Sequence, residues 1–293
     1  MIYAYGITAQ GAYHIKNNTP CQDAHNIVKL RDNMVIAAVA DGLGSMEHSD
    51  IASKLAVEVS VNYCKESIAS SSNSDEILKI IEASFSLAQN TIEKEAQNNG
   101  HRIEQYDTTL TLAVMNDEIL YYGHSGDSGI IALTTEGLYE KVTEQQRDDE
   151  ARVFPLFFKN KWIFKQYEKN VSSVLLATDG MLGTFFPIYI KNEPVNIHVT
   201  LARFFMDNKR LHIDKLGEDL VKMRIEQFIL NIPCDQVDDD KTVVVLINTD
   251  IEPSLQPDDY YKEPDWVELK RKRDEELKKL LYPNFFKGKS EGD

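Results

Sequence analysis

A run of small and β-branched apolar residues that ends in an acidic turn constrains the fold of this chain more than any other feature. The run covers residues 35–40 and leads into Asp41 and Gly42. An unbroken apolar run of this length is typical of a β-strand that is covered on both faces. Alone, an Asp-Gly pair indicates only a turn. The carboxylate nevertheless leaves a rigid strand at its end, where functional groups are often found.

The pairing of an acidic residue with a strand end returns along the chain. An apolar run at 174–177 leads to Asp179, Asp240 precedes an apolar run at 242–247, and Asp127 lies among glycines. Carboxylates that gather at one edge raise one another's pKa values unless cations share the site. Mg²⁺ and Mn²⁺ prefer such oxygen ligands, and two ions roughly 3.5–4 Å apart can activate a water and brace a phosphoryl oxygen. The pattern therefore predicts a centre for hard divalent cations.

The composition is that of a globular, acidic protein. Hydrophobic residues make up 42% of the chain, and 47 acidic residues against 32 basic ones give a formal net charge of −15. A nucleic-acid surface would need a basic stripe and is not expected. Cys21, Cys64 and Cys234 lack the spacing of a disulfide framework or a zinc site. No stretch reaches the roughly 18 apolar residues of a membrane span, and no signal peptide is recognised, so we expect a cytoplasmic protein without membrane contact.

The order of the predicted elements indicates an α+β fold of antiparallel sheets flanked by helices. Strand patterns cover residues 2–12, 26–30, 34–40, 108–114, 119–123, 128–133, 173–177 and 242–247, and helical spacing is found at 52–63, 77–92, 199–205 and 221–232. Ser49 is the candidate N-cap of the first helix. The segment 13–23 contains Pro20 and predicts a loop. Residues 144–170 are irregular, charged and aromatic, which is typical of a functional or mobile excursion.

The composition changes beyond residue 250. Residues 252–264 predict an acidic, proline-containing linker, and residues 265–281 predict a charged helix. Glu268, Asp274 and Glu275 each precede a lysine by four residues, which supports that helix. We therefore divide the chain into a catalytic unit at 1–250 and an appendage at 251–293. The incomplete apolar stripe of the helix leaves two roles open, packing on its own domain or binding a partner or a second copy.

Six short motifs occur in a fixed order over about residues 5–248. They are Cys21-Gln22-Asp23, Ala40-Asp41-Gly42, Asp107-Thr108-Thr109-Leu110, Gly126-Asp127-Ser128, Ala177-Thr178-Asp179-Gly180 and Asp239-Asp240-Lys241-Thr242. In this order they resemble the metal-dependent serine/threonine protein phosphatases of type 2C, and the early stretch is closest to a bacterial branch of that family. The resemblance implies a four-layer α-β-β-α sandwich of two antiparallel sheets flanked by helix pairs.

The resemblance also implies a set of site residues. Asp41 is implied to bridge two metal ions, and the carbonyl of Gly42 to bind one of them. Asp179 and Asp240 are implied to complete the site of the other ion. Asp23 is implied to act through a metal-bound water, and Asp127 to face a third ion. Asp41 and Asp23 are the implied catalytic residues, and Mg²⁺ or Mn²⁺ is the implied cofactor. The implied reaction is hydrolysis of phosphoserine or phosphothreonine on proteins by an activated water, with a cognate serine/threonine kinase as a further partner. Residues 144–170 fall where the family has its flap.

The chain departs from the family pattern at four positions. Leu43 replaces a histidine that is a proposed general acid, Asn18 replaces a phosphate-binding arginine, Gly129 replaces an arginine and Gly183 replaces an aspartate. Lys16 and His14 are therefore the candidates for binding the substrate phosphate, although lysine lacks the bidentate fork of arginine. His14, His48 and His124 are the histidines that could supply a general acid, and each is also typical of a structural role.

Three functions remain open from the sequence. The first is an active phosphatase that loses turnover when Asp41 is neutralised. The second is a catalytically weak or inactive phosphatase-like module that acts as a regulatory binding protein. The third is a purely structural antiparallel-sheet protein, for which neutralising Asp41 or Asp179 would raise the stability even with metal present, because only repulsion would be relieved.

Overall fold

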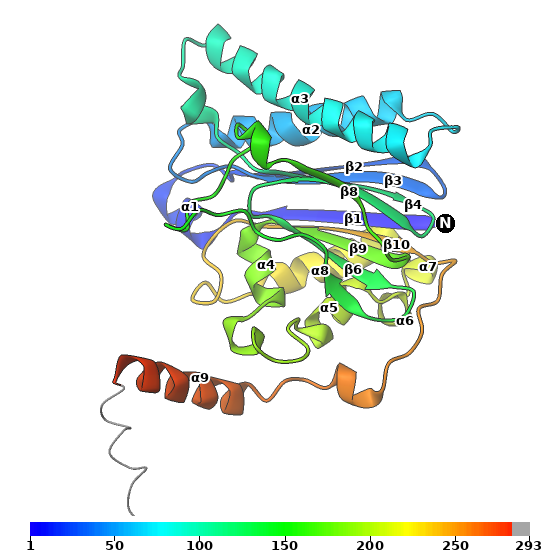
Figure 1. Ribbon diagram of the computed structural model, residues 1–293, viewed down its shortest axis with the longest axis vertical. Helices are drawn as coiled ribbons and strands as arrows, with labels where there is room; N and C mark the ends of the chain where they lie inside the picture. Colours follow the sequence, from blue (N-terminus) through cyan, green and yellow to red (C-terminus); the bar gives the residue numbers. More distant parts are fainter. Residues whose placement is uncertain (283–293) are drawn as a thin grey trace, which may run out of the picture.

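Two five-stranded antiparallel sheets stack face to face, with helices on both outer sides, in the computed structural model, which describes residues 1–282 (Figure 1). The first sheet has the order β1 (Ile2–Ala9), β10 (Lys241–Asn248), β9 (Val171–Ala177), β6 (Gly129–Thr134) and β7 (Tyr139–Lys141). The second has the order β2 (Asp23–Arg31), β3 (Met34–Asp41), β4 (Leu110–Asn116), β5 (Ile119–Ser125) and β8 (Ile163–Gln166). The predicted α+β fold and its four-layer α-β-β-α architecture are confirmed.

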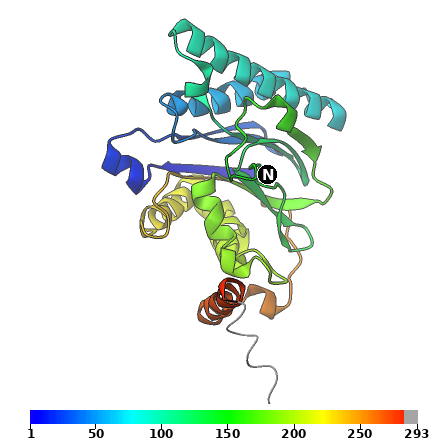
Figure 2. The ribbon, with the colours of Figure 1, turned by 60° about the vertical axis from the view of Figure 1, so that its left-hand side comes forward.

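The helices divide between the two outer faces (Figure 2). The second sheet is covered by α2 (Ser49–Ser67) and α3 (Ser74–Asn98). The first sheet is covered by a group of shorter helices, α4 (Asp179–Phe185), α5 (Val199–Met206), α6 (Asn208–Leu211), α7 (Ile213–Leu216) and α8 (Glu218–Leu230). Short 3-10 turns lie at η1 (Ile103–Tyr106), η2 (Lys159–Lys161), η3 (Ile188–Ile190) and η4 (Asp258–Tyr261).

Strand β3 is buried on both faces, as its apolar run predicts. Val35 and Val39 point into the layer between the two sheets, where they pack with side chains of β10 and β9. Ile36 and Ala38 point the other way and pack under α2 and α3. Because both faces are occupied, the backbone that carries Asp41 has no room to shift, and the carboxylate is held on a rigid support.

Three local predictions are wrong. Residues 12–17 form a short helix, α1 (Ala12–Asn17), where Pro20 indicated a loop. The proline lies beyond the helix, which Asn18 ends in a left-handed conformation with φ of 54°. Ser49 is the first residue of α2 and donates to the carbonyl of Met46, so it does not cap the helix. Part of the irregular stretch 144–170 pairs with β5 as strand β8.

The C-terminal helix, α9 (Trp266–Leu281), is confirmed and packs on η3. Its ion pairs differ from the predicted acid–lysine pairs. Within residues 1–282 they join Arg271 to Glu268 and Glu275, and Arg273 to Glu276, because the longer arginine side chains reach both neighbouring turns. The division of the chain at residue 250 stays a prediction. Among the described helices, none is long and apolar enough to cross a membrane.

Two glycines in α4 give a matched test of backbone packing. A Cβ on Gly180 would lie 2.1 Å from the carbonyl oxygen of Asp240, whereas a Cβ on Gly183 would meet nothing within 4 Å. We expect Gly180→Ala to lower the free energy of unfolding by more than about 1 kcal/mol. Gly183→Ala should raise it by about 0.5–1 kcal/mol, because alanine restricts the unfolded chain and favours a helix. Urea denaturation of both variants measures these changes, and equal effects would contradict the packing described.

Candidate active site

Three carboxylates from three separate segments meet at one edge of the sandwich. Asp41 is the last residue of β3, Asp127 lies in the turn between β5 and β6, and Asp179 is the first residue of α4. Each side chain offers an oxygen, and these oxygens all lie within 4.8 Å of one another. The hydroxyl of Thr109 accepts a hydrogen bond from the Asp41 amide at 2.9 Å and fixes the end of β3. The structure therefore brings together three of the predicted metal ligands.

Burial and mutual repulsion raise the pKa values of Asp41 and Asp127. Burial is the largest cause for Asp41, whose pKa is well above its ordinary value, and the charges of Asp23, Asp179 and Asp127 add to it. Burial and the charge of Asp179 raise the pKa of Asp127 to about 6, against the opposing effect of Arg147. The metal-free cluster therefore favours partial protonation. A bound cation would remove the repulsion between the carboxylates that causes it.

A cation from the flap region already reaches this cluster. Nη2 of Arg147 lies 2.5 Å from Oδ2 of Asp127 and 3.1 Å from Oδ2 of Asp179. The sequence reasoning missed Arg147, although it singled out the stretch 144–170 that contains it. The signal that could have found it is a basic residue in an irregular segment next to a predicted anionic site.

The donor set fits a hard divalent cation. Oδ1 of Asp127 is buried and has no hydrogen-bond partner within residues 1–282. Such an orphaned acceptor is costly unless a cation or water meets it. The three carboxylates are oxygen donors of the kind that Mg²⁺ and Mn²⁺ prefer. We conclude that Asp41, Asp127 and Asp179 are suited to bind such an ion.

Asp23 lies beside this group and is held by hydrogen bonds. It is the first residue of β2 and pairs with Asp41 across the strands. The hydroxyl of Thr178 donates to Oδ2 of Asp23 at 2.7 Å. Burial raises the pKa of Asp23 well above its ordinary value, and the bonds from Thr178 and Thr242 oppose that rise. Asp23 therefore reaches the edge of the cluster without belonging to the close group of three.

Asp240 lies in a second group, with His14 and Asp239, whose possible ligand atoms also lie within 4.8 Å of one another. Its oxygens accept hydrogen bonds from the amides of Gly11 and Gln22, both at 2.6 Å, and Oδ1 lies 2.8 Å from Nδ1 of His14. Burial would raise the pKa of Asp240, but the contact with His14 and the two amide bonds outweigh it and hold the pKa below its ordinary value. Asp240 therefore ties the segment around α1 to the start of β2.

Asp239 is placed differently from its neighbour. Its side chain is exposed and lines the same cavity as Asp179. Partial burial of the carboxyl oxygens and then the charges of Asp179 and Asp240 raise its pKa, against the hydrogen bond that Oδ1 accepts from the Asp240 amide at 2.8 Å. Its Cβ lies 3.6 Å from the position of a Cβ on Gly180. The sequence predicts Asp240 as a metal ligand within a run of three aspartates, and that assignment stays a prediction.

The predicted phosphate-binding residues, Lys16 and His14, lie outside the close group of Asp41, Asp127 and Asp179. Lys16 is exposed on α1, and His14 contacts Asp240. The other two histidines are engaged: His48 stacks on His101 with ring centroids 4.1 Å apart, and His124 is buried between Thr111 and the carbonyl of Glu144. A Cβ on Gly129 would lie 2.7 Å from a terminal methyl group of Leu182, so a larger side chain there would require that leucine to move.

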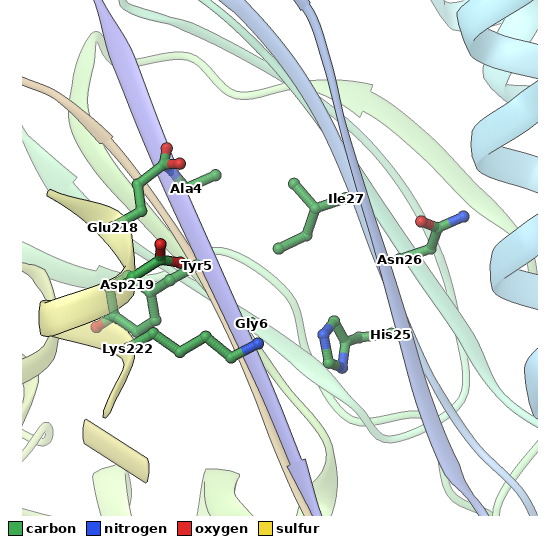
Figure 3. Close-up of a pocket in the computed structure, with 9 residues that line it drawn as sticks. All are labelled: Ala4, Tyr5, Gly6, His25, Asn26, Ile27, Glu218, Asp219 and Lys222. Atoms are coloured by element: carbon green, nitrogen blue, oxygen red, sulfur yellow. The ribbon is translucent and has the colours of Figure 1, made fainter. Parts of the chain in front are cut away.

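A second, smaller cavity lies between β1 and β2, away from the carboxylates (Figure 3). Its volume is about 320 Å³, and its polar lining includes His25, Glu218, Asp219 and Lys222. Burial, and then the charge of Lys222, lower the pKa of His25 to about 4. Glu218 and Asp219 line this cavity but belong to neither of the groups of described residues whose ligand atoms lie close enough to hold a metal ion, so it is not the candidate centre.

The pH dependence of stability gives a test of the cluster. Because the pKa of Asp127 is about 6 in the metal-free folded protein and about 3.9 in the unfolded chain, folding binds a proton between these values. This contribution to stability is complete below the unfolded pKa and is lost as the pH rises through about 6. We expect Asp127→Asn to gain about 2 kcal/mol relative to wild type between pH 4 and pH 7 in chelator.

The measurement is urea denaturation of both proteins at several pH values in EDTA. The difference between the two proteins is the quantity to follow, because His25 and His124, whose pKa values are lowered to about 4 chiefly by burial, titrate with the opposite sign. A difference that stays constant from pH 4 to pH 7 would contradict the assigned environment of Asp127.

The sandwich fold and the group of carboxylates can be compared with known protein families. The sequence profile described as protein phosphatase 2C matches residues 10–211, which is more than half of the chain. The chain belongs to the protein phosphatase 2C family, and the resemblance drawn from its motifs is confirmed. A comparison with curated protein sequences finds no significant match.

Solved structures of bacterial phosphatases share the fold at low sequence identity. The S. agalactiae serine/threonine phosphatase is 15% identical with a TM-score of 0.59, and the match covers 84% of this chain and 99% of that one. Serine/threonine phosphatase Stp1 from Staphylococcus aureus is 16% identical with a TM-score of 0.56, covering 84% and 95%. Mycobacterium tuberculosis PstP/Ppp is 15% identical with a TM-score of 0.54, covering 84% and 98%. At this identity the likeness concerns the fold.

Proposed function

We propose that this protein hydrolyses phosphoserine and phosphothreonine on proteins with the help of two divalent cations, Mg²⁺ or Mn²⁺. The observation that carries the proposal is the close group of Asp41, Asp127 and Asp179 in a chain of the protein phosphatase 2C family. When bound, the cations supply positive charge for the phosphoryl oxygens and lower the pKa of water at neutral pH. A cognate serine/threonine kinase and a role in bacterial signalling in the cytoplasm belong to the same proposal.

The chain's own residues have separate tasks in this proposal. Asp41, Asp179 and the carbonyl of Gly42 hold the ions, and Asp127 extends the site. We assign the remaining ligand to Asp239 in place of Asp240, because both oxygens of Asp240 already accept backbone hydrogen bonds. Asp23 accepts a hydrogen bond or a proton from water entering the centre.

Arg147 is proposed as the group that binds the phosphate of the substrate. The family's early arginine is replaced by Asn18, whose left-handed conformation would strain a longer side chain. The guanidinium of Arg147 instead approaches the centre from the flap and has the fork that lysine lacks. This assignment replaces the earlier candidates, Lys16 and His14.

The Arg147 assignment predicts a change in KM. We expect Arg147→Lys to raise KM for a phosphothreonine peptide roughly tenfold and Arg147→Ala to raise it further, because a point charge replaces a bidentate donor and is then lost. Inorganic phosphate should inhibit both variants more weakly in the same assay. Arg152→Ala, which removes another flap arginine that pairs with Asp148, is the matched control. Equal KM values for Arg147→Ala and wild type would contradict the assignment.

Hydrolysis of a phosphothreonine peptide and of an aryl phosphate tests the proposal as a whole. Released phosphate should appear with Mn²⁺ or Mg²⁺ and disappear with a chelator. Metal binding without turnover of either substrate would favour a second candidate function, an inactive phosphatase-like module that binds a partner. The observation that favours this candidate is the replacement of the family's histidine by Leu43, which cannot donate a proton.

A further inference from the structure

A large cavity adjoins the carboxylate centre on the side of the first sheet. It has a volume of about 1030 Å³, at the upper end of ordinary ligand sites. Asp179 and Asp239 line it, so that its lining is continuous with the proposed centre. The rest of the lining is mainly apolar and comes from α4, α5, α8, the loops around them and α9: Pro187, Tyr189, Leu201, Phe228, Ile232, Val237 and Trp266.

The C-terminal helix builds one wall of this cavity. Trp266 and Lys270 lie one helical turn apart on α9 and both line it. Both residues lie outside the 10–211 range that matches the family, so this wall belongs to a part of the chain that the family match leaves out. Figure 1 shows α9 as the outermost layer, beyond α4 and α5.

The start of α9 is fixed in place by side-chain contacts. Nε1 of Trp266 donates to Oε1 of Glu263 at 2.7 Å, and Nε2 of His198 lies 3.0 Å from the same oxygen. The rings of His198 and Trp266 meet edge to face with centroids 4.9 Å apart. Leu269, on the next turn, is only 9% exposed. These contacts make the wall a fixed part of the surface beside the centre.

The cavity leaves an apolar surface open to solvent. Tyr189 and Phe228 line it and are 39% and 38% exposed, although both are large apolar side chains. Such a patch beside a catalytic centre is typical of a binding surface. Lys270 is exposed on the α9 side of the cavity and adds a positive charge to its lining. The acidic side chains of the lining lie next to the carboxylate centre.

We propose that this cavity binds the polypeptide of the phosphoprotein substrate next to its phosphorylated residue. It would accept a bulky apolar side chain beside the phosphoresidue, packed on Trp266 and Phe228, and an acidic residue that faces Lys270. The proposal rests on the proposed phosphatase function, because continuity with Asp179 and Asp239 is what places the bound chain beside the reacting phosphate. The C-terminal helix is then a determinant of substrate specificity.

The test measures binding to the full chain with labelled peptides. Each peptide carries a non-hydrolysable phosphonate in place of phosphothreonine, and anisotropy is measured with Mg²⁺. The reference peptide has leucine beside this residue and glutamate further along; two others replace the leucine by glycine or the glutamate by lysine. Wild type should bind the glycine peptide about tenfold more weakly, or about 1.4 kcal/mol, because glycine removes the side chain that the apolar lining would bury.

Two variants separate the apolar contact from the charge. Trp266→Ala should weaken binding of the reference peptide about tenfold and remove the preference for leucine over glycine. Lys270→Glu should reverse the preference between the glutamate and lysine peptides, a result that unfolding of α9 would not produce. Val267→Ala and Lys278→Glu, on the same helix but outside the cavity lining, are the matched controls and should bind like wild type.

The activity readout distinguishes this inference from the proposed function. Hydrolysis of the aryl phosphate should be the same in wild type, Trp266→Ala and Lys270→Glu, because that ester reaches only the centre. Absence of all hydrolysis in wild type would overturn the proposed function, while the anisotropy would still decide the role of the cavity. Preferences that stay unchanged in both variants would overturn the inference. The inference would also be overturned if the cavity bound a second copy of the chain. In that case wild type would not bind the peptides, and its sedimentation coefficient would differ from those of the two variants.

Discussion

Asp41→Asn is expected to lower metal-dependent hydrolysis at least about a thousandfold while making the metal-free protein more stable. Asp41 is the residue that the family resemblance implies as the shared ligand of both ions, so its neutralisation would weaken the binding of both, and it lies in the close group of carboxylates at the end of β3. A thousandfold loss corresponds to about 4 kcal/mol of transition-state stabilisation. Without metal, the change removes a carboxyl group whose pKa is raised by burial and by the charges of Asp23, Asp179 and Asp127.

The stability of this variant is expected to change sign with metal. In EDTA we expect Asp41→Asn to gain about 1–3 kcal/mol in the free energy of unfolding, because repulsion is relieved. With saturating Mg²⁺ the wild type should become the more stable protein, since a ligand that binds only the folded state adds to its stability. Urea denaturation with and without metal measures both values. Asp32→Asn, at the opposite end of β3, is the control. A variant that is more stable in both conditions would support the purely structural reading instead.

Asp240→Ala is expected to destabilise the fold strongly, and Asp239→Ala is expected to leave the metal-free fold intact. Removing Asp240 leaves the amides of Gly11 and Gln22 without their acceptor and His14 without its partner. The loss of a charged partner from buried groups typically lowers the free energy of unfolding by about 3–5 kcal/mol. Asp239 is exposed and accepts a hydrogen bond from the part-buried amide of Asp240 at 2.8 Å, so its loss should cost only about 1 kcal/mol.

Denaturation in EDTA, followed by metal titration, separates these two roles. Asp239→Ala should unfold at nearly the wild-type urea concentration in EDTA and gain much less stability from Mg²⁺. Asp240→Ala should unfold at a much lower urea concentration in either condition. If Asp240→Ala were as stable as wild type in EDTA and lost only the response to metal, the ligand would be Asp240, as the motif resemblance first implied.

The sequence predicted the layers of the fold because apolar periodicity reports burial directly. The run at 35–40 is apolar on both faces, and both faces are buried in β3. The short helix α1 was not predicted, because six residues carry too little periodicity to outweigh the nearby Pro20. Element order and motif order together were enough to identify the family.

The centre was predicted less completely than the fold. The proximity of Asp41, Asp127 and Asp179 could be predicted because each stands near a strand end with glycine nearby. The choice between Asp239 and Asp240 depends on which carboxylate meets the amides of Gly11 and Gln22, a contact between segments far apart in the chain. Arg147 is a contact of the same kind: a flap residue meets two distant turns, and no local pattern encodes it.

Anomalous diffraction from crystals soaked in Mn²⁺ tests the central claim most directly. The account predicts strong peaks among the carboxylates of Asp41, Asp127, Asp179 and Asp239, and a loss of those peaks in Asp41→Asn. Asp240 should keep its bonds to the amides of Gly11 and Gln22 in the same maps. Maps without a peak at these carboxylates, at a Mn²⁺ concentration that supports hydrolysis, would contradict the two-cation centre.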